Sequence, residues 1–326
     1  MTTIFNRTFA ALAMLTSLAV GNAVKAEDFP DRPVTIIVPY APGGQGDITG
    51  RLIAEHLSGL IGQPVTVENQ SGANGVIGIS AIAEAEPDGY TIGVVVASHA
   101  MARALVPNLP YDPVKSFAPI TTTARTDIVL VANPKLGVHD LKGFIEYAKA
   151  HPGEVAFDSS GPGSNSHVFG EWLADTAGLD LIHVPYKGAG DALPDLLSGV
   201  LQFSFKSVPA VRGYLDNKQL VAIAAGGPER TPIYPDLPTA AEQGLTGFAA
   251  NSWGMVMAPA KVPADRIAFL NAKIVEVLKR PDVVDKFHSM GANVVANTPD
   301  EARTMLENEE KTYSDLISRL GITLNK

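Results

Sequence analysis

The first candidate for ligand chemistry is a glycine-rich turn at residues 42–46, Pro-Gly-Gly-Gln-Gly. It follows a β-branched run at Val34–Val38, and apolar residues with helical spacing begin just beyond it, at Ile48. Asp47 stands where an N-cap residue would accept a hydrogen bond from a first-turn amide. Glycine lets a ligand approach the backbone closely, and the free amides of a helix start attract anions. The pattern predicts an anion-binding turn, but a plain capped connection would use the same residues.

Two later segments repeat this order of strand, polar turn and helix. "SSGPGSNSH" at 159–167 follows a predicted strand that ends at Phe157, and "PYKG" at 185–188 follows one that ends at Val184. Asp191 is placed to cap the helix after the second of these turns. Ligands of open α/β sheets bind beyond the carboxyl ends of the strands. We therefore expect the three turns to converge on a cleft between two domains.

The charges of these turns indicate the kind of ligand. Residues 39–47 and 158–167 contain no Lys or Arg, and the third turn offers only Lys187. An anion there would be held mainly by backbone amides, hydroxyls, helix-start dipoles and waters. Such a site favours a carboxylate over a polyphosphate, which usually recruits Lys, Arg or Mg²⁺.

Two kinds of enzyme are alternatives to a binding protein. Ser164 or Ser160 with His167 has the residue types of a serine hydrolase, but the G-x-S-x-G nucleophile elbow is missing. Glycines 44, 46 and 50, with an acid at Glu68, resemble a nicotinamide-binding fingerprint, but their spacing departs from G-x-G-x-x-G. We therefore expect no enzymatic activity and no cofactor.

The composition is that of a globular protein with an exported leader. The chain has 326 residues, of which 46% are hydrophobic and 18% charged, enough for roughly two domains. Arg7, an apolar run from Phe9 to Val20 and the Val-Lys-Ala sequence ending at Ala26 predict a signal peptide, cleaved after Ala26, and a periplasmic protein. The mature chain loses two basic residues and no acid, so its formal charge changes from −9 to −11, which argues against nucleic-acid binding.

Metal and disulfide chemistry find no support in the sequence. The chain has no cysteine, and its seven histidines show neither H-x-x-x-H nor H-E-x-x-H spacing. We therefore expect no metal site and no disulfide framework.

The remaining pattern alternates apolar runs with helix-like segments, which predicts an α/β fold with parallel sheets covered by helices. The predicted strands are Val34–Val38, Val65–Val67, Thr91–Val96, Ile128–Val131, Val155–Phe157, Leu181–Val184, Phe203–Phe205, Val221–Ala225 and Gly254–Met257. The predicted helices are Ile48–Leu60, Leu141–His151, Ser166–Ala177, Ala192–Ser198, Arg266–Lys279 and Asp300–Leu320. The largely helical C-terminal part is expected to pack back on the first domain.

Eight phrases along nearly the whole mature chain resemble the Bug family, the solute-binding proteins of tripartite tricarboxylate transporters. They are "VTIIVPYAPGGQGD", "IGQPVTVENQSGANGVIG", "AEPDGYTIGV", "LPYDPVKSFAPI", "SSGPGSNSH", "HVPYKGAGDALPDLLSG", "LPTAAEQG" and "NSWGMVMAPAKVP". The resemblance implies a periplasmic binding protein type II-like fold, in which two α/β domains close over a small carboxylate. The expected domains are 27–126 with 252–326, and 127–251, hinged near Ile128–Val131 and Trp253–Met257.

The resemblance also implies a set of ligand-binding residues. They are Tyr40, Gly43, Gly44, Asp47 and Ser98 on the first domain, and Ser159, Ser160, Ser164, Asn165, His167, Tyr186 and Gly188 on the second. We add Lys206, which could pair with a second carboxylate. Gln202 replaces an aspartate that relatives often carry, so a di- or tricarboxylate or an aromatic acid is expected rather than an amino acid. The expected protein is a monomer that delivers its ligand to the membrane subunits of the transporter.

Overall fold

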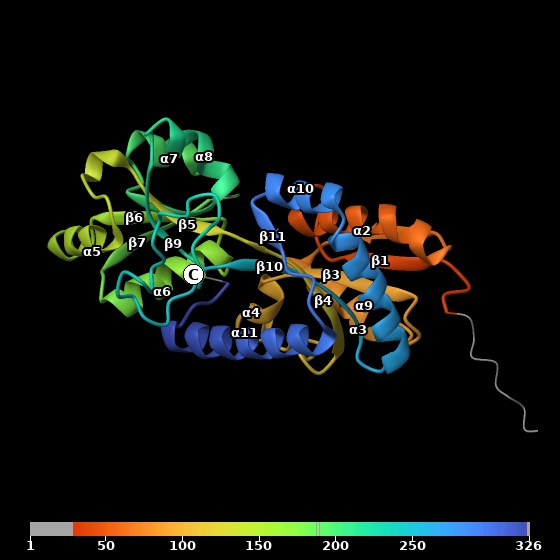
Figure 1. Cartoon of the computed structure of the whole chain (residues 1–326). Coiled ribbons are helices and arrows are strands. Elements are labelled where there is room, and N and C mark those ends of the chain that lie inside the picture. The colour runs from red at the N-terminus through yellow and green to blue at the C-terminus, as the bar shows by residue number, and fades with distance from the viewer. Residues whose placement is uncertain (1–28, 187, 189, 325–326) are drawn as a thin grey trace, which may run out of the picture. The chain divides into compact units, whose positions relative to one another are not determined.

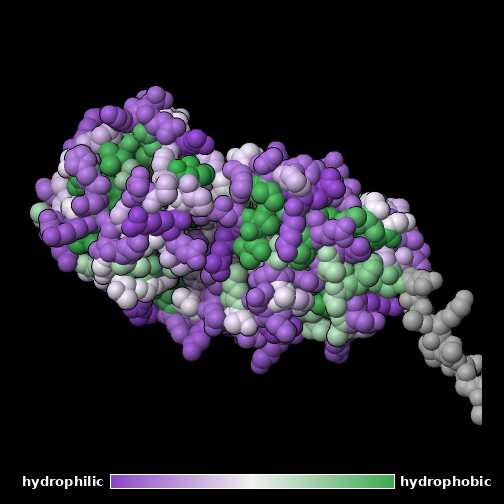
Figure 2. All heavy atoms as spheres, viewed as in Figure 1, coloured by the Kyte–Doolittle hydropathy of each residue, from purple (hydrophilic) through white to green (hydrophobic). Residues whose placement is uncertain are grey.

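Two β-sheets with their helices make up the described part of the chain (Figure 1). The structure is a computed structural model and describes residues 29–186, 188 and 190–324. The predicted leader, residues 1–26, lies outside the described residues. Among the described residues, no helix has the length and apolar character needed to cross a bilayer. Hydrophilic side chains cover most of the face seen in Figure 2.

The first sheet has six strands in the order β11-β4-β10-β3-β1-β2. Strand β1 is parallel to β2 and β3, whereas β10 is antiparallel to β3 and β4. The strands are β1 (Val34–Val38), β2 (Val65–Asn69), β3 (Thr91–Val96), β4 (Phe117–Thr126), β10 (Ser252–Pro259) and β11 (Ala292–Val294). Its helices are α2 (Gln45–Ile61), α3 (Val76–Glu84), α4 (Ser98–Leu105), α9 (Ala264–Leu278), α10 (Pro281–Ser289) and α11 (Pro299–Leu320). We call this sheet and its helices the first lobe.

The second sheet has five strands in the order β7-β6-β8-β5-β9. Strand β6 is parallel to β7 and β8, whereas β5 is antiparallel to β8 and β9. The strands are β5 (Ile128–Ala132), β6 (Val155–Ser159), β7 (Leu181–Pro185), β8 (Phe203–Ser207) and β9 (Val221–Ala225). Its helices are α5 (Leu141–Ala150), α6 (Asn165–Ala177), α7 (Leu193–Ser198) and α8 (Val208–Asp216). This is the second lobe.

The chain crosses between the lobes twice. Strand β4 leads through Asp127 into β5, and the chain returns from β9 through residues 226–251 into β10. The Asp127 side chain accepts hydrogen bonds from Thr231 Oγ1 at 2.8 Å and from Asn293 Nδ2 at 3.0 Å, so it ties the crossing to both lobes. Helix α11 contacts α4 and β4 in the first lobe and α6 in the second, where Arg319 pairs with Asp175 at 2.9 Å.

The α/β class is confirmed, but the expectation of parallel sheets is wrong, because β4, β5 and β10 run against their neighbours. Strands β1, β3 and β9 have the predicted bounds; the other predicted strands extend one or two residues further at the C-terminal end, and β10 extends two residues at each end. Strands β4 and β11 and helices α3, α4, α8 and α10 were not predicted. The apolar core includes rings packed edge to face, such as those of Phe144 and Phe203, whose centroids are 4.7 Å apart.

Candidate functional site

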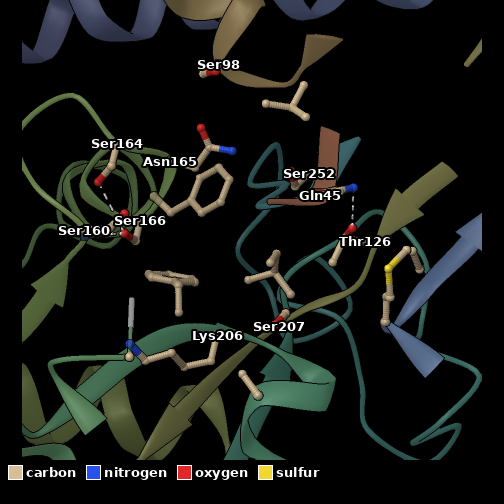
Figure 3. Close-up of a pocket in the computed structure, with 18 of the residues that line it drawn as sticks. Gln45, Ser98, Thr126, Ser160, Ser164, Asn165, Ser166, Lys206, Ser207 and Ser252 are labelled. Atoms are coloured by element: carbon tan, nitrogen blue, oxygen red, sulfur yellow. Dashed lines mark hydrogen bonds between the residues drawn. The ribbon is translucent and has the colours of Figure 1, made fainter. Parts of the chain in front are cut away.

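A cleft of about 830 Å³ lies where the two lobes meet, at the carboxyl ends of β1, β3, β6 and β8 (Figure 3). The first lobe contributes Tyr40, Gln45, Ile48, Val96, Ser98, Thr126, Ser252, Met290 and Ala292. The second lobe contributes Ile128, Ser160, Gly163, Ser164, Asn165, Ser166, Phe169, Gly190, Leu193, Phe205, Lys206, Ser207, Ala210 and Val211. Of the predicted ligand residues, six therefore line the cleft: Tyr40, Ser98, Ser160, Ser164, Asn165 and Lys206.

The wall of the first lobe is built from the starts of α2 and α4. The Tyr40 hydroxyl lies 3.4 Å from Ser98 Oγ and accepts from the Val96 amide at 3.4 Å. Burial raises the pKa of Tyr40, so its hydroxyl remains a neutral donor at physiological pH. Gln45 Nε2 donates to Thr126 Oγ1 at 3.1 Å, which orients both side chains at the cleft (Figure 3).

Asp47 is buried beside the glycine-rich turn and holds its conformation through hydrogen bonds. The helix begins at Gln45 with Gly44 as its N-cap, so the prediction that Asp47 is the N-cap is wrong. Instead the Asp47 carboxylate accepts from the Gly43 amide and from Asn69 Nδ2, both at 2.9 Å. Arg51, 2.9 Å away, is the main cause that lowers the pKa of Asp47 from 3.8 to about 2. Asp47 is 4% exposed and, like Gly43 and Gly44, is not among the residues that line the cleft.

Two glycines of α2 allow it to pack closely on β1 and on Tyr40. A Cβ on Gly50 would lie 3.0 Å from Val38, and one on Gly46 would lie 3.2 Å from the Tyr40 ring. These contacts explain Gly46 and Gly50 without a pyrophosphate. Glu68, the proposed ribose-binding acid, is exposed on the edge strand β2.

The wall of the second lobe is the turn between β6 and α6. Ser164 is the N-cap of α6, and its Oγ accepts from the His167 amide at 3.4 Å. The Ser166 hydroxyl accepts from the Ser160 amide at 3.2 Å, so the turn is held by its own hydroxyls. Asn165 projects from this turn toward the opposite wall (Figure 3). Ser159 is fully buried, 2.6 Å from His183 Nε2, and does not line the cleft.

His167 is part of the support for that turn. Its Nδ1 accepts from the Gly163 amide at 3.0 Å, and its ring stacks on His183 with centroids 3.9 Å apart. Burial, followed by the charge of His183, lowers the pKa of His167 to about 4, so the ring is neutral at pH 7. Between these two described residues, the structure records no hydrogen bond from Ser164 Oγ to either ring nitrogen. The nucleophile and base of the alternative hydrolase reading, Ser164 and His167, are therefore not joined by a side-chain hydrogen bond in this structure.

His167, Glu171 and His183 place one donor atom each within 4.8 Å of one another, and the group is the candidate for a metal site. The tautomer of His167 is not the one that would bind a metal through Nε2. Because His167 Nδ1 accepts a hydrogen bond from the Gly163 amide, the proton of the neutral ring is on Nε2. Nε2 is the nitrogen that lies 3.8 Å from Glu171. A protonated nitrogen cannot ligate a metal, so these residues do not fit one as they are arranged.

None of the described residues of the third predicted turn lines the cleft; Gly190 and Leu193, just after it, do. Tyr186 donates its hydroxyl to Asp195 at 2.6 Å and is not among the residues lining the cleft, nor is Gly188, whose carbonyl accepts from the Asp191 amide. Burial and then Asp195 raise the pKa of Tyr186 to about 12. Helix α7 begins after Ala192, so Asp191 is not its cap.

Several cleft residues were missed. Thr126 and Ser252 come from the two crossing strands, where they are paired with each other. Gln45 and Ser207 stand at the starts of α2 and α8. The available signal for Gln45 was its place inside the predicted anion-binding turn, residues 42–46. Nothing in the sequence identifies the pairing of Thr126 with Ser252.

Gln202 does not face the cleft. Its Oε1 accepts from the Ala156 amide at 2.7 Å and its Nε2 donates to the Gly199 carbonyl at 3.1 Å, which fixes the turn before β8. The residue at this position therefore does not itself decide whether the ligand carries an amino group.

The electrostatics of the cleft favour an anion. No Asp or Glu is among the described residues that line it, and Lys206 is the charged residue among them. Helices α2, α4, α6 and α8 all begin at the cleft, and the first-turn amides of a helix have no partner within the helix. Each start adds a partial positive charge. The cleft can therefore hold an anion by amides, hydroxyls and dipoles, as the sequence predicted.

Comparisons with known proteins agree with this arrangement. Residues 49–322 match the family described as "Tripartite tricarboxylate transporter family receptor". The chain is 36% identical to Protein BugT of Bordetella pertussis over 312 residues, which cover 95% of this chain and 96% of BugT. Among solved structures, an R. palustris protein with adipate is 31% identical, with a TM-score of 0.75, over 90% of this chain and 99% of that one. MatC from Rhodopseudomonas palustris with bound malate is 32% identical, with a TM-score of 0.71, over 89% of this chain and 100% of that one. The chain belongs to the tripartite tricarboxylate transporter receptor family, of which the Bug proteins are members.

Proposed function

We propose that this protein is an extracytoplasmic receptor that captures a small organic carboxylate in the cleft and delivers it to a tripartite tricarboxylate-type membrane transporter. Its family and the adipate and malate bound to its relatives support this function. The observation that carries it is the cleft itself, where four helix starts meet and none of the described lining residues is acidic. No chemistry on the ligand is required.

In the proposed site, the predicted residues have two roles. Tyr40, Ser98, Ser160, Ser164 and Asn165 contact the ligand directly, because they line the cleft. Gly43, Gly44, Asp47, Ser159, His167, Tyr186 and Gly188 hold the three turns in the conformation that presents their amides.

Binding is proposed to act through closure of the lobes. A ligand that touches both walls stabilises the closed state, because it makes contacts there that the open state lacks. The domains are 27–126 with 252–326, and 127–251, and they move about the two crossings, with hinges near Ile128–Val131 and Trp253–Met257. The protein is proposed to be a periplasmic monomer, exported by residues 1–26.

A thermal-shift and calorimetry screen of the exported protein tests the receptor function. The panel contains dicarboxylates, tricarboxylates, aromatic acids and amino acids. A ligand that binds only the folded state raises the melting temperature, and we expect this from at least one carboxylate. If none of them shifts the melting temperature while an ester substrate is hydrolysed, the receptor function is refuted in favour of the hydrolase.

A matched pair of variants locates the site. Ile48 is half-buried at the cleft in the first turn of α2, and Ile77 is 56% exposed on α3. Ile48→Asp places a negative charge beside the α2 amides, where it is compatible with the helix but repels an anion. We expect at least a tenfold loss of affinity for Ile48→Asp and an unchanged affinity for Ile77→Asp. Equal affinities in both variants would place the ligand elsewhere.

A further inference from the structure

Lys206 has an unusual position for a lysine. It lies near the end of β8, next to Ser207, the N-cap of α8, and its side chain lines the cleft although it is only 5% exposed. Its Nζ lies 2.6 Å from Asp158 Oδ2, in an ion pair whose carboxylate side chain is 2% exposed. A buried ammonium is costly unless it is paired, and Asp158 is the partner that offsets this cost.

The pair is oriented with respect to the cleft. Lys206 lines the cleft, whereas Asp158 does not and lies behind it on β6. Within the described chain, Asp158 Oδ1 has no hydrogen-bond partner, so the carboxylate is not neutralised by further donors. The cleft therefore meets the positive end of this ion pair, and Ala210 in the first turn of α8 lines the same cleft.

This corner is separate from the wall built by α2 and α4. Figure 3 shows Ser98 and Lys206 at opposite ends of the cleft, with Asn165 and Gln45 between them. Helix α8 has nine residues, so it adds its own start dipole at the lysine end. Two places that favour an anion, at two ends of one cleft without lining acids, suit a ligand with two anionic ends.

On the basis of the proposed function, we infer that the ligand is a dicarboxylate and that Lys206 binds its second carboxylate, in competition with Asp158. The first carboxylate is held by the α2 and α4 wall. Asp158 has two opposite effects: it is the partner that allows the ammonium to be buried, and it offsets part of the attraction that a ligand carboxylate feels. Lys206 is thus the specificity-determining residue, and Asp158 tunes it.

Calorimetry with matched ligands tests this inference. The probes are succinate and adipate, each with its monoamide, which keeps the shape but replaces one carboxylate by a neutral group. We expect the wild-type protein to bind its preferred dicarboxylate at least tenfold more tightly than the corresponding monoamide. Lys206→Met should remove this preference. Since that variant leaves Asp158 buried without its cation, the double variant Lys206→Met with Asp158→Asn keeps the test valid if the single one does not fold.

The Asp158→Asn variant is the most decisive, because the two roles of Asp158 predict opposite changes in the dicarboxylate affinity. Removing a competitor should raise the affinity, whereas removing a supporting group should lower it. If Asp158 competes for the ammonium, its removal should raise the affinity for the dicarboxylate several-fold and change that for the monoamide less. A weaker dicarboxylate affinity in a folded Asp158→Asn protein would overturn the inference, as would equal binding of dicarboxylate and monoamide by the wild type. The latter leaves the carboxylate receptor intact, whereas a failure of every carboxylate to bind refutes both proposals.

Discussion

Asp47 offers a quantitative test of how the glycine-rich turn is held. Replacing it by Asn keeps the shape of the side chain but removes the charge that Arg51 and the Gly43 amide stabilise. The pKa of Asp47 falls from 3.8 in a free chain to about 2 in the folded protein, a difference of roughly 1.8 units. At about 1.36 kcal/mol per unit this corresponds to roughly 2.4 kcal/mol at pH 7. Because Arg51 is 54% exposed and solvent screens the pair, we expect Asp47→Asn to cost at most about 2 kcal/mol.

The pH dependence gives this prediction its sign. Since folding lowers the pKa of Asp47, the stability it contributes is fully present above pH 3.8 and is lost as the pH falls through about 2. At pH 3 roughly half of the difference between wild type and Asp47→Asn should remain. Urea denaturation at pH 7 and pH 3 measures it, with exposed Asp315→Asn on α11 as the control. A difference that is the same at both pH values, or absent at pH 7, would refute this account of the turn.

Three further predictions concern the turns and the core. Gly44→Ala, whose Cβ would meet only a backbone oxygen at 3.7 Å, should fold normally. Because Gly44 does not line the cleft, its carboxylate affinity by calorimetry should also be unchanged, and a clear loss would show that the turn touches the ligand. Gly59 lies near the C-terminal end of α2, and a Cβ there would have no neighbour within 4 Å. Gly59→Ala should therefore leave binding unchanged and raise the stability by about 0.5–1 kcal/mol. Gly170→Ala should lower the stability by roughly 1–3 kcal/mol or more in urea denaturation, because its Cβ would lie 1.9 Å from the Phe157 ring. Since the pKa of His167 is lowered to about 4, the folded protein should lose up to about 3 kcal/mol as the pH falls from 6.5 to 4, and His167→Gln should lose less over the same range.

The sequence predicts those elements that consist of an uninterrupted run of apolar residues. Strands β1 and β3 are uninterrupted β-branched runs, and both have the predicted bounds. Strand β4 was missed because its centre is a run of threonines, Thr121–Thr123, preceded by Pro119. These threonines are fully buried, and Thr121 Oγ1 donates to the Asn297 carbonyl at 2.9 Å. Burying a polar hydroxyl is less costly where a distant group accepts its hydrogen bond, as Asn297 does for Thr121, and the sequence does not show that partner.

The same limit applies to the site. The convergence of the turns follows from the rule that strand ends meet at one edge of a sheet. The cleft contains residues of the first two turns, and next to the third turn it contains Gly190, two residues further along the chain. Which of two neighbouring residues faces the cleft depends on where the strand ends. Ser160, just after β6, lines the cleft, whereas Ser159, the last residue of β6, faces His183. Thr126 and Ser252 enter the cleft through the pairing of β4 with β10, residues 126 positions apart in the chain. No local pattern encodes that register.

The acidity of the chain and the character of the cleft have one common explanation. The protein carries 34 acidic residues and a formal charge of −9, so its distant field repels an anion rather than attracting it. Solvent ions screen that field beyond roughly 10 Å, whereas the helix starts act within the first turn, at the place where the ligand would sit. Since each parallel strand that ends at the cleft is followed by a helix, the fold itself directs the positive helix ends inward. Affinity for an anion therefore does not require a basic protein; it requires only that the described lining contain no acid to cancel those dipoles, and it contains none.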